Sequence, residues 1–246
     1  MPVIVQKSVF NDISFSIWRI EESLDFFYLN LHLTKSCKER LDKLKSNEMK
    51  KQFLSVRKLI ELNGINLDKL YYNNDGIPFL LNGKNISISH TKGFSSIAIS
   101  SKPVGVDIQC FRDKILNISK KFINIEESNL IDYNSIKELT LVWSIKEATY
   151  KVFRKPGLDF KDEIKIQSIS KNLSNSKIEV EKFEKKYFFN SFNIIESDYI
   201  CSIVQSNEWD SWLFISTIFY LLTDRCGFGN FSSNFWFFIC VVFKKQ

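Results

Sequence analysis

The stretch WSIKEATYK, residues 143–151, places charged side chains inside an otherwise apolar and aromatic segment. On a helix, residues four positions apart share a face, so Glu147 and Lys151 bring a carboxylate and an ammonium group toward one point. As an exposed ion pair they would contribute only about 0.3–0.5 kcal/mol. The Leu, Val, Ile and Ala residues around them leave little of this helix for solvent, which favours a carboxylate that is buried or lines a cleft.

A second carboxylate, Asp107, lies near the end of the apolar run VGVDIQ at residues 104–109, which is typical of a buried strand. An aspartate at a strand end often only caps the following turn. A buried one is costly unless it is paired, hydrogen-bonded or bound to a metal. Together, Asp107 and Glu147 form a ligand set for a hard divalent ion such as Mg²⁺, which takes one or two carboxylates and completes its shell with waters and substrate phosphates.

The segment NISISHTKG, residues 85–93, contains one of only two histidines in the chain. A hydrogen-bonded histidine in a turn is the ordinary interpretation. However, Ser89, His90 and Thr91 are followed by a lysine and a glycine, so hydroxyls, a ring, an ammonium group and open backbone donors come together. This composition suits a phosphate cradle.

Arg57 follows Lys50 by seven residues in KKQFLSVRK, so the two lie on one face of a predicted helix. A solvated basic face is the ordinary explanation. Alternatively, a guanidinium at this position would hold a terminal phosphate through two parallel hydrogen bonds, which lysine cannot do.

The surrounding sequence predicts short elements that alternate between helix and strand. We expect a half-buried strand at 13–20, followed by a helical region from Ser36 to Leu62 with a capping box in SCKE and a break near Ser46-Asn47. A small antiparallel sheet with NNDG and NG turns should extend from Leu70 to Gln109. A second helix is expected from Ile125 to Phe153, and further strands within 177–205. The order of helix then strands occurs twice. We therefore predict an α+β chain with an N-terminal lobe at 1–103 and a C-terminal lobe at 104–206.

The last part of the chain, 207–246, has a different composition. Its apolar runs at 212–222 and 235–243 are shorter than the roughly 20 residues that a membrane-spanning helix needs. We predict no membrane span there and assign this tail no function.

Composition excludes several classes of protein. The net charge of +6 is spread along the 246 residues, which indicates an anionic ligand or an acidic partner rather than a nucleic-acid surface, although nucleic-acid binding stays a weaker option. The five cysteines form no CxxC pair, so neither a disulfide framework nor a zinc site is indicated. The first residues lack the pattern of a signal peptide, and we expect a cytoplasmic protein.

Three segments in order, GIPFLLNGKNISISHT, GVDIQ and WSIKEATYK, resemble the motifs of the 4′-phosphopantetheinyl transferase superfamily. By organisation, the resemblance covers roughly residues 13–205 and points to the two-lobed monomeric branch, which activates carrier proteins. The helix motif is the most specific of the three, and the GVD strand is weak by itself.

This resemblance implies transfer of the phosphopantetheine arm of coenzyme A (CoA) to a serine of an apo acyl or peptidyl carrier protein, with release of adenosine 3′,5′-bisphosphate. It also implies two similar lobes, each a helix packed on a small antiparallel sheet, with the active-site cleft between them. The implied Mg²⁺ ligands are Asp107 and Glu147, with Gln109 as a poorer one acting through a water. Glu147 would also take the proton of the serine, and Lys151 would neutralise the pyrophosphate. Ser89, His90 and Thr91 would hold CoA phosphates, and Arg57 the 3′-phosphate.

Two positions depart from the family pattern. Gln109 replaces a second acid that many members carry after the strand aspartate, and Ile77 replaces a lysine. The main alternative is therefore a catalytically silent relative that binds CoA or a carrier protein. A metal-dependent phosphohydrolase using Asp107, Glu147 and His90 fits less well, because such sites usually contain more acids and histidines. The sequence does not indicate which carrier protein is the partner.

Overall fold

The computed structural model describes residues 3–10, 12–154 and 157–207, all of which belong to one compact unit, Met1–Trp209. The tail prediction for 207–246 falls almost entirely outside these residues. Within the described part of the chain, no helix is both long and apolar enough to cross a membrane.

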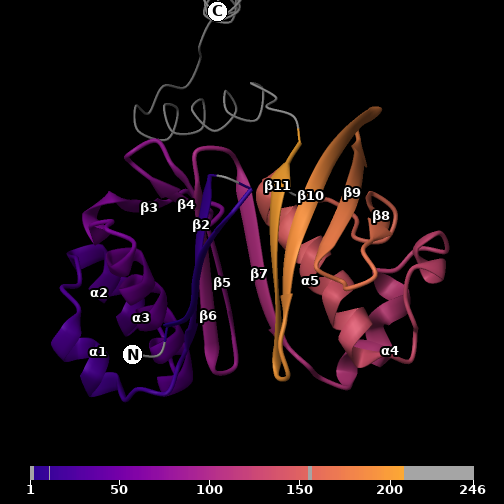
Figure 1. Cartoon of the computed structure of the whole chain (residues 1–246). Helices are drawn as coiled ribbons and strands as arrows, with labels where there is room; N and C mark the ends of the chain where they lie inside the picture. The colour runs from indigo at the N-terminus through magenta and orange to yellow at the C-terminus, as the bar shows by residue number, and fades with distance from the viewer. Residues whose placement is uncertain (1–2, 11, 155–156, 208–246) are drawn as a thin grey trace, which may run out of the picture. The chain divides into compact units, whose positions relative to one another are not determined.

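The N-terminal half forms a four-stranded antiparallel sheet, a small hairpin and three helices (Figure 1). The sheet has the order β1 (Val3–Val9), β2 (Ile13–Arg19), β6 (Phe94–Ser100) and β5 (Asn85–Thr91). The helices are α1 (Leu24–Asn30), α2 (Lys35–Asp42) and α3 (Asn47–Leu62), and the hairpin pairs β3 (Leu70–Tyr72) with β4 (Pro78–Leu80).

The C-terminal half forms a five-stranded antiparallel sheet and a long helix. The sheet has the order β7 (Val104–Cys110), β11 (Tyr199–Ser206), β10 (Lys185–Ile195), β9 (Asn175–Lys182) and β8 (Ile164–Ile169). The helices are the short α4 (Lys114–Ile118) and the long α5 (Ile136–Phe153).

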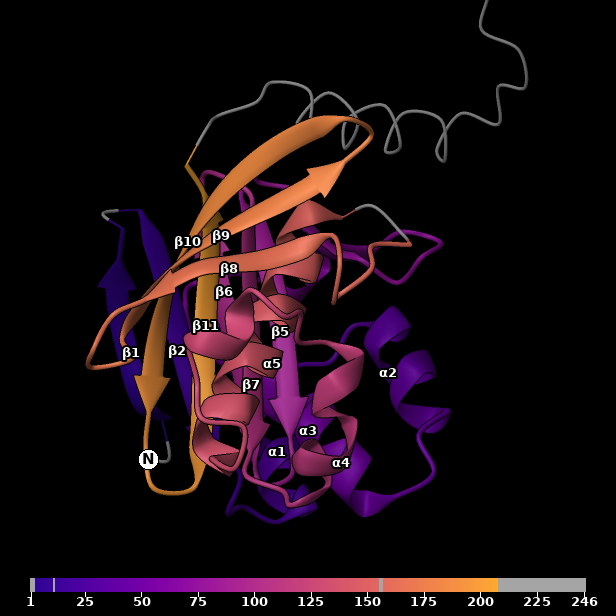
Figure 2. The same cartoon turned by 90° about the vertical axis from the view of Figure 1, so that its right-hand side faces the viewer.

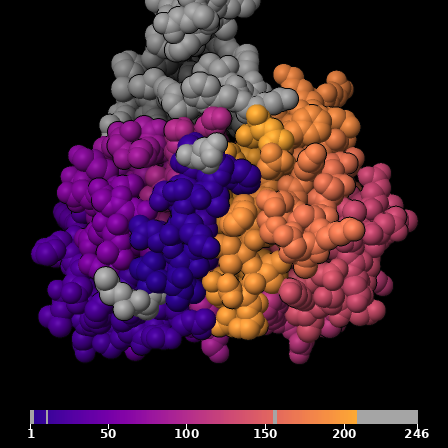
Figure 3. Space-filling view, in the orientation of Figure 1, coloured from indigo at the N-terminus to yellow at the C-terminus, as the bar shows by residue number. Residues whose placement is uncertain are grey.

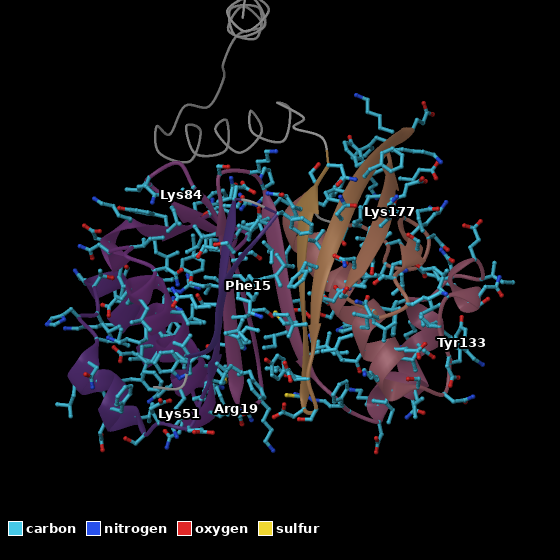
Figure 4. The ribbon with its side chains drawn as sticks, viewed as in Figure 1. Phe15, Arg19, Lys51, Lys84, Tyr133 and Lys177 are labelled. Atoms are coloured by element: carbon cyan, nitrogen blue, oxygen red, sulfur yellow. The ribbon has the colours of Figure 1, made fainter. Side chains whose placement is uncertain are left out.

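These elements stack in four layers, helix, sheet, sheet and helix, as Figures 1 and 2 show from two sides. One apolar cluster joins α3 to the first sheet, and another joins α5 to the second sheet. A third cluster fills the space between the sheets, and Phe15 of β2 lies there (Figure 4). Phe15 and Val106 of β7, which belongs to the same cluster, are fully buried. On one face of the molecule, the atoms of β1 and β2 lie directly against those of β11 (Figure 3). The predicted α+β class is therefore confirmed, whereas duplication of the lobes stays a prediction.

Two predicted helix starts are wrong. The helix expected from Ile125 begins at Ile136, where the Ser135 side chain accepts a hydrogen bond from the Glu138 amide; residues 127–129 form only a short 3-10 turn. The SCKE capping box is not used, because the Thr34 side chain caps α2 two residues earlier. The expected break at Ser46-Asn47 is confirmed, since Ser46 caps α3.

The single sheet predicted from Leu70 to Gln109 is also wrong, because this segment contributes strands to three sheets. The NNDG turn closes the separate β3–β4 hairpin, β5 and β6 join the first sheet, and β7 joins the second. The strand prediction within 177–205 is confirmed by β9, β10 and β11.

Candidate active site

Two sheets meet where β5 runs beside β7, and serine side chains connect them. Ser87 Oγ accepts a hydrogen bond from the Val106 amide at 2.9 Å, and Ser89 Oγ accepts one from the Ile108 amide at 3.2 Å. These hydroxyls take the place of a strand ladder, since β5 and β7 belong to different sheets. The contact brings Ser89 next to Asp107.

Asp107 is 2% exposed, and both of its carboxylate oxygens are hydrogen-bonded. Its Oδ1 accepts from Ser89 Oγ at 2.8 Å and from Lys151 Nζ at 2.7 Å, whereas its Oδ2 accepts from Gln109 Nε2 at 2.9 Å. The buried charge is thereby compensated, as burial of an ionised carboxylate requires.

Helix α5 approaches β7 closely at Gly105. A Cβ at this position would overlap the carbonyl oxygen of Ala148 and lie 3.0 Å from the Val152 amide nitrogen, so only glycine allows the contact. Ser144 Oγ on the same helix donates to the Asp107 carbonyl at 3.2 Å, and Lys151 Nζ donates to the Val106 carbonyl at 3.0 Å. One face of α5 is thus fixed against β7.

Glu147 lies on this face and is partly buried. Burial raises the pKa of its carboxyl; the nearby Asp107 charge raises it further, and Lys151 acts in the opposite direction. The repulsion shows that the two carboxylates lie within electrostatic reach of each other. Among the described residues, Glu147 has no side-chain hydrogen bond.

A pocket of about 490 Å³ opens beside Asp107 and Lys151. Residues from both halves of the unit line it, including Arg57, Ser89, His90, Asp107 and Lys151. The pKa of His90 is lowered, first by loss of hydration at the pocket wall and then by Lys151 and Arg57, with Asp107 opposing them. His90 retains solvent contact at the mouth, so its ring is available to a ligand.

Arg57 is 3% exposed, so the solvated basic face considered for it is wrong. Its guanidinium donates to the Phe53 carbonyl at 3.3 Å and to the Tyr72 hydroxyl at 3.0 Å, while its Nε is buried without a partner. Its carbon Cζ stacks 3.3 Å from the centre of the Phe53 ring. No carboxylate within the described ranges pairs with it, so its charge is free for an anionic ligand.

Thr91 is placed differently from its neighbours. Thr91 ends β5, is 6% exposed and, unlike Ser89 and His90, does not line the pocket. Its hydroxyl accepts from Arg112 at 3.4 Å. The structure therefore brings together every predicted phosphate-binding residue except Thr91.

The sequence analysis missed an ion pair on the other side of α5. Lys146 is completely buried, and its Nζ donates to Glu127 Oε2, the Phe160 carbonyl and the Ile164 carbonyl, each at 2.7 Å. Glu127 in turn accepts from the Ile166 amide at 2.7 Å. A lysine inside an apolar helix was a visible signal, but its partner lies in a turn that the pattern predicted as helix.

The donor set fits a hard divalent ion. No group of three or more His, Cys, Asp or Glu residues that could hold a metal occurs in the described part of the chain. However, Asp107 and Glu147 offer two carboxylates that repel each other, and one divalent cation would relieve this repulsion. Their oxygens are ligands that Mg²⁺ prefers, provided that substrate phosphate and water complete its shell.

The fold and this pocket define an α+β protein with a groove, lined by cationic side chains, at the junction of two antiparallel sheets. Residues 103–204 match the family model ACPS, the 4′-phosphopantetheinyl transferase superfamily. The chain therefore carries a domain of this superfamily, which contains Asp107, Glu147 and Lys151. The family-level resemblance is confirmed, while the two-lobed monomeric branch stays a prediction. A search of curated proteins finds no match.

Proposed function

We propose that the protein transfers 4′-phosphopantetheine from CoA to a serine hydroxyl of an apo carrier protein. The observation that carries this proposal is the convergence of Asp107, Lys151, His90 and Arg57 around one groove, within and beside a domain of the transferase superfamily. Glu147 lies within electrostatic reach of Asp107 and Lys151. The groove is assembled from a single chain, which supports a monomeric enzyme. We also propose the cytoplasm as its compartment.

In the proposed reaction, the serine oxygen attacks the β-phosphorus of CoA, and the bond between that phosphorus and the bridging oxygen breaks. Adenosine 3′,5′-bisphosphate leaves with that oxygen, and the serine proton goes to Glu147, directly or through a water. A carboxylate with a raised pKa is a better proton acceptor than an ordinary one.

The other residues act by position and charge. Lys151 donates to Asp107 and to the Val106 carbonyl and offers its third proton to the diphosphate, where negative charge develops on the leaving group. Arg57 and His90 would hold the 3′-phosphate and a further CoA phosphate. Asp107 and Glu147, with Gln109 through a water, would hold Mg²⁺, whose chemistry is to neutralise the diphosphate oxygens.

Mass measurement of the carrier tests this proposal. The protein is incubated with CoA, Mg²⁺ and each of a panel of apo carrier proteins, and the carriers are then weighed. A gain equal to one phosphopantetheine group supports the transferase. Release of phosphate from CoA without a carrier would instead indicate a phosphohydrolase.

A catalytically silent CoA-binding or carrier-binding relative is the second candidate, and Gln109 favours it. This residue presents its amide nitrogen to Asp107 Oδ2 at 2.9 Å, where a second acid would have added a negative ligand. The site consequently has one charge less for Mg²⁺. Tight CoA binding with no change in carrier mass, at saturating Mg²⁺, would select this candidate.

A further inference from the structure

A second pocket, of about 430 Å³, continues the groove beyond Lys151. Both pockets share Lys151 and part of the wall formed by Gly76, Pro78 and Ile88, so they are two arms of one groove. The second arm is mainly apolar, and its cationic residue besides Lys151 is Arg154. The proposed function assigns no role to this residue.

Arg154 is a cation whose hydrogen-bonding groups are incompletely satisfied by the described residues. Its Nε is buried without a hydrogen bond, and its Nη2 makes only a long contact of 3.5 Å with the Ile86 carbonyl. Its Cζ lies 5.2 Å from the centre of the Phe79 ring. No carboxylate among the described residues pairs with it, and Asp75, the acid of this arm, lies exposed and makes no ion pair with it.

The backbone of Arg154 is also unusual. It ends α5 in the left-handed conformation, with φ of 56°, a position where glycine is favoured because it has no Cβ. Burial lowers the pKa of its guanidinium to about 10, so the group stays charged at neutral pH. The chain thus keeps a partly buried, charged arginine at a position that glycine would occupy with less strain.

Resting on the proposed function, we propose that Arg154 is a substrate-binding residue that holds the diphosphate of CoA together with Lys151. Lys151 on the last turn of α5 and Arg154 at its C-cap both line the second arm, so the two cations face the same cavity. The charge of Lys151 is already offset by Asp107 at 2.7 Å. A diphosphate therefore needs a further cation, and Arg154 supplies it from the second arm of the groove.

The variant Arg154→Gly tests this role without endangering the fold. Because glycine suits the left-handed position, the melting temperature should stay the same or rise, whereas an arginine with a purely structural role would lower it on removal. Calorimetric titration with CoA should show affinity reduced by about 10-fold or more, because a charge-assisted contact is lost.

Two ligands and one control variant locate the contact. Arg154→Gly should weaken binding of CoA and of 3′-dephospho-CoA by the same factor. Arg57→Gln should weaken binding of CoA much more than binding of 3′-dephospho-CoA, because we assign Arg57 to the 3′-phosphate. Unchanged affinity of Arg154→Gly for both ligands overturns the inference, and so does a loss confined to CoA. Failure of the wild-type protein to bind CoA would instead refute the proposed function.

Discussion

Glu147 carries a carboxylate without a cationic partner of its own, because the short hydrogen bond of Lys151 goes to Asp107. Two acids thus share one ammonium group in a site that excludes much of the solvent. Such an arrangement costs stability in the metal-free protein, and it is useful only if a cation or a proton enters the reaction there.

The substitution Glu147→Gln should separate catalysis from folding. We expect transfer to fall by about 10²- to 10⁴-fold, because the amide cannot accept the serine proton. Single-turnover assays at saturating CoA measure this loss. Replacement of the exposed Glu126 by glutamine is the control and should leave transfer unchanged. Turnover like that of the wild type in Glu147→Gln would rule out the assigned base.

The same variant should raise the stability of the metal-free protein at neutral pH. A carboxyl whose pKa is raised by folding binds its proton more tightly in the native state than in the unfolded state. The wild type therefore gains stability from this group as pH falls through the raised pKa, and lacks that gain at neutral pH. Denaturation midpoints of Glu147→Gln and of the wild type are measured with a chelator at pH 7 and near pH 4. The midpoint of the variant should exceed that of the wild type at pH 7, and the two should be similar near pH 4.

At the residue scale, the sequence predicted candidate site residues whose signal lies within a single helix or strand. Glu147 and Lys151 followed from helical spacing, and Asp107 from an apolar strand. Arg154 and Lys146 were missed for a physical reason: their roles depend on neighbours distant in the chain. Lys146 donates a hydrogen bond to Glu127 in a turn, and Arg154 donates one to the Ile86 carbonyl of β5.

Among the elements, the contact between α5 and β7 sets the geometry of the groove. Gly105→Ala should push the helix away from the strand, because the new methyl group would meet the Ala148 carbonyl. We expect about 1–3 kcal/mol lower stability. We expect transfer to fall as well, by about 10²-fold, because Lys151 shifts relative to Asp107. Chemical denaturation and carrier mass analysis measure the two effects, and native values for both would contradict this account.

The two lysines of the helix motif should behave in opposite ways. Lys146→Met leaves the buried Glu127 charge uncompensated and should lower the free energy of unfolding by about 3–5 kcal/mol. Lys151→Met leaves the buried Asp107 with only the neutral donors Ser89 and Gln109, but the lysine is 27% exposed and water can take its place, so we expect a smaller loss of stability together with loss of transfer. Urea denaturation of both variants compares them. Equal stability of the two would show that Lys146 does not anchor α5.

The positions of helices and strands were predictable where the apolar pattern was regular. The predictions failed where side-chain hydrogen bonds decide where an element begins. The apolar period located β2, β7 and most of α5. It extended α5 back to Ile125, because the pattern cannot reveal that the Glu127 carboxylate bonds to backbone amides of the turn and of β8. The wrong start of α2 has a similar cause, since Thr34 and Ser36 are both acceptable helix caps.

On the scale of the whole molecule, every residue assigned to the groove lies within 3–207. A chain that ends at residue 207 should therefore transfer phosphopantetheine at a rate close to that of the full chain. Carrier mass analysis on both chains, with circular dichroism as the control for folding, makes the comparison. An inactive but folded short chain would assign the tail a role that we do not propose.

The helix-then-strand order predicted the fold class, but not how the halves join. The two sheets stack face to face through Phe15, Ile17, Val106 and Ile203, and this pairing depends on strands more than 180 residues apart in sequence. Alternation of apolar and polar residues predicts which side chains share a face of one strand. It does not predict which face of one sheet packs on which face of the other.

The serine bridge between β5 and β7 has a consequence for motion. The amides of Val106 and Ile108 are held by single hydroxyls rather than by a strand ladder, so local opening of this contact would break no hydrogen bond within either sheet. Ser89 also bonds to Asp107, so such a separation would loosen the acid at the same moment. Deuterium uptake at these two amides would therefore report opening of the contact and loss of the Ser89 hydrogen bond to Asp107 together.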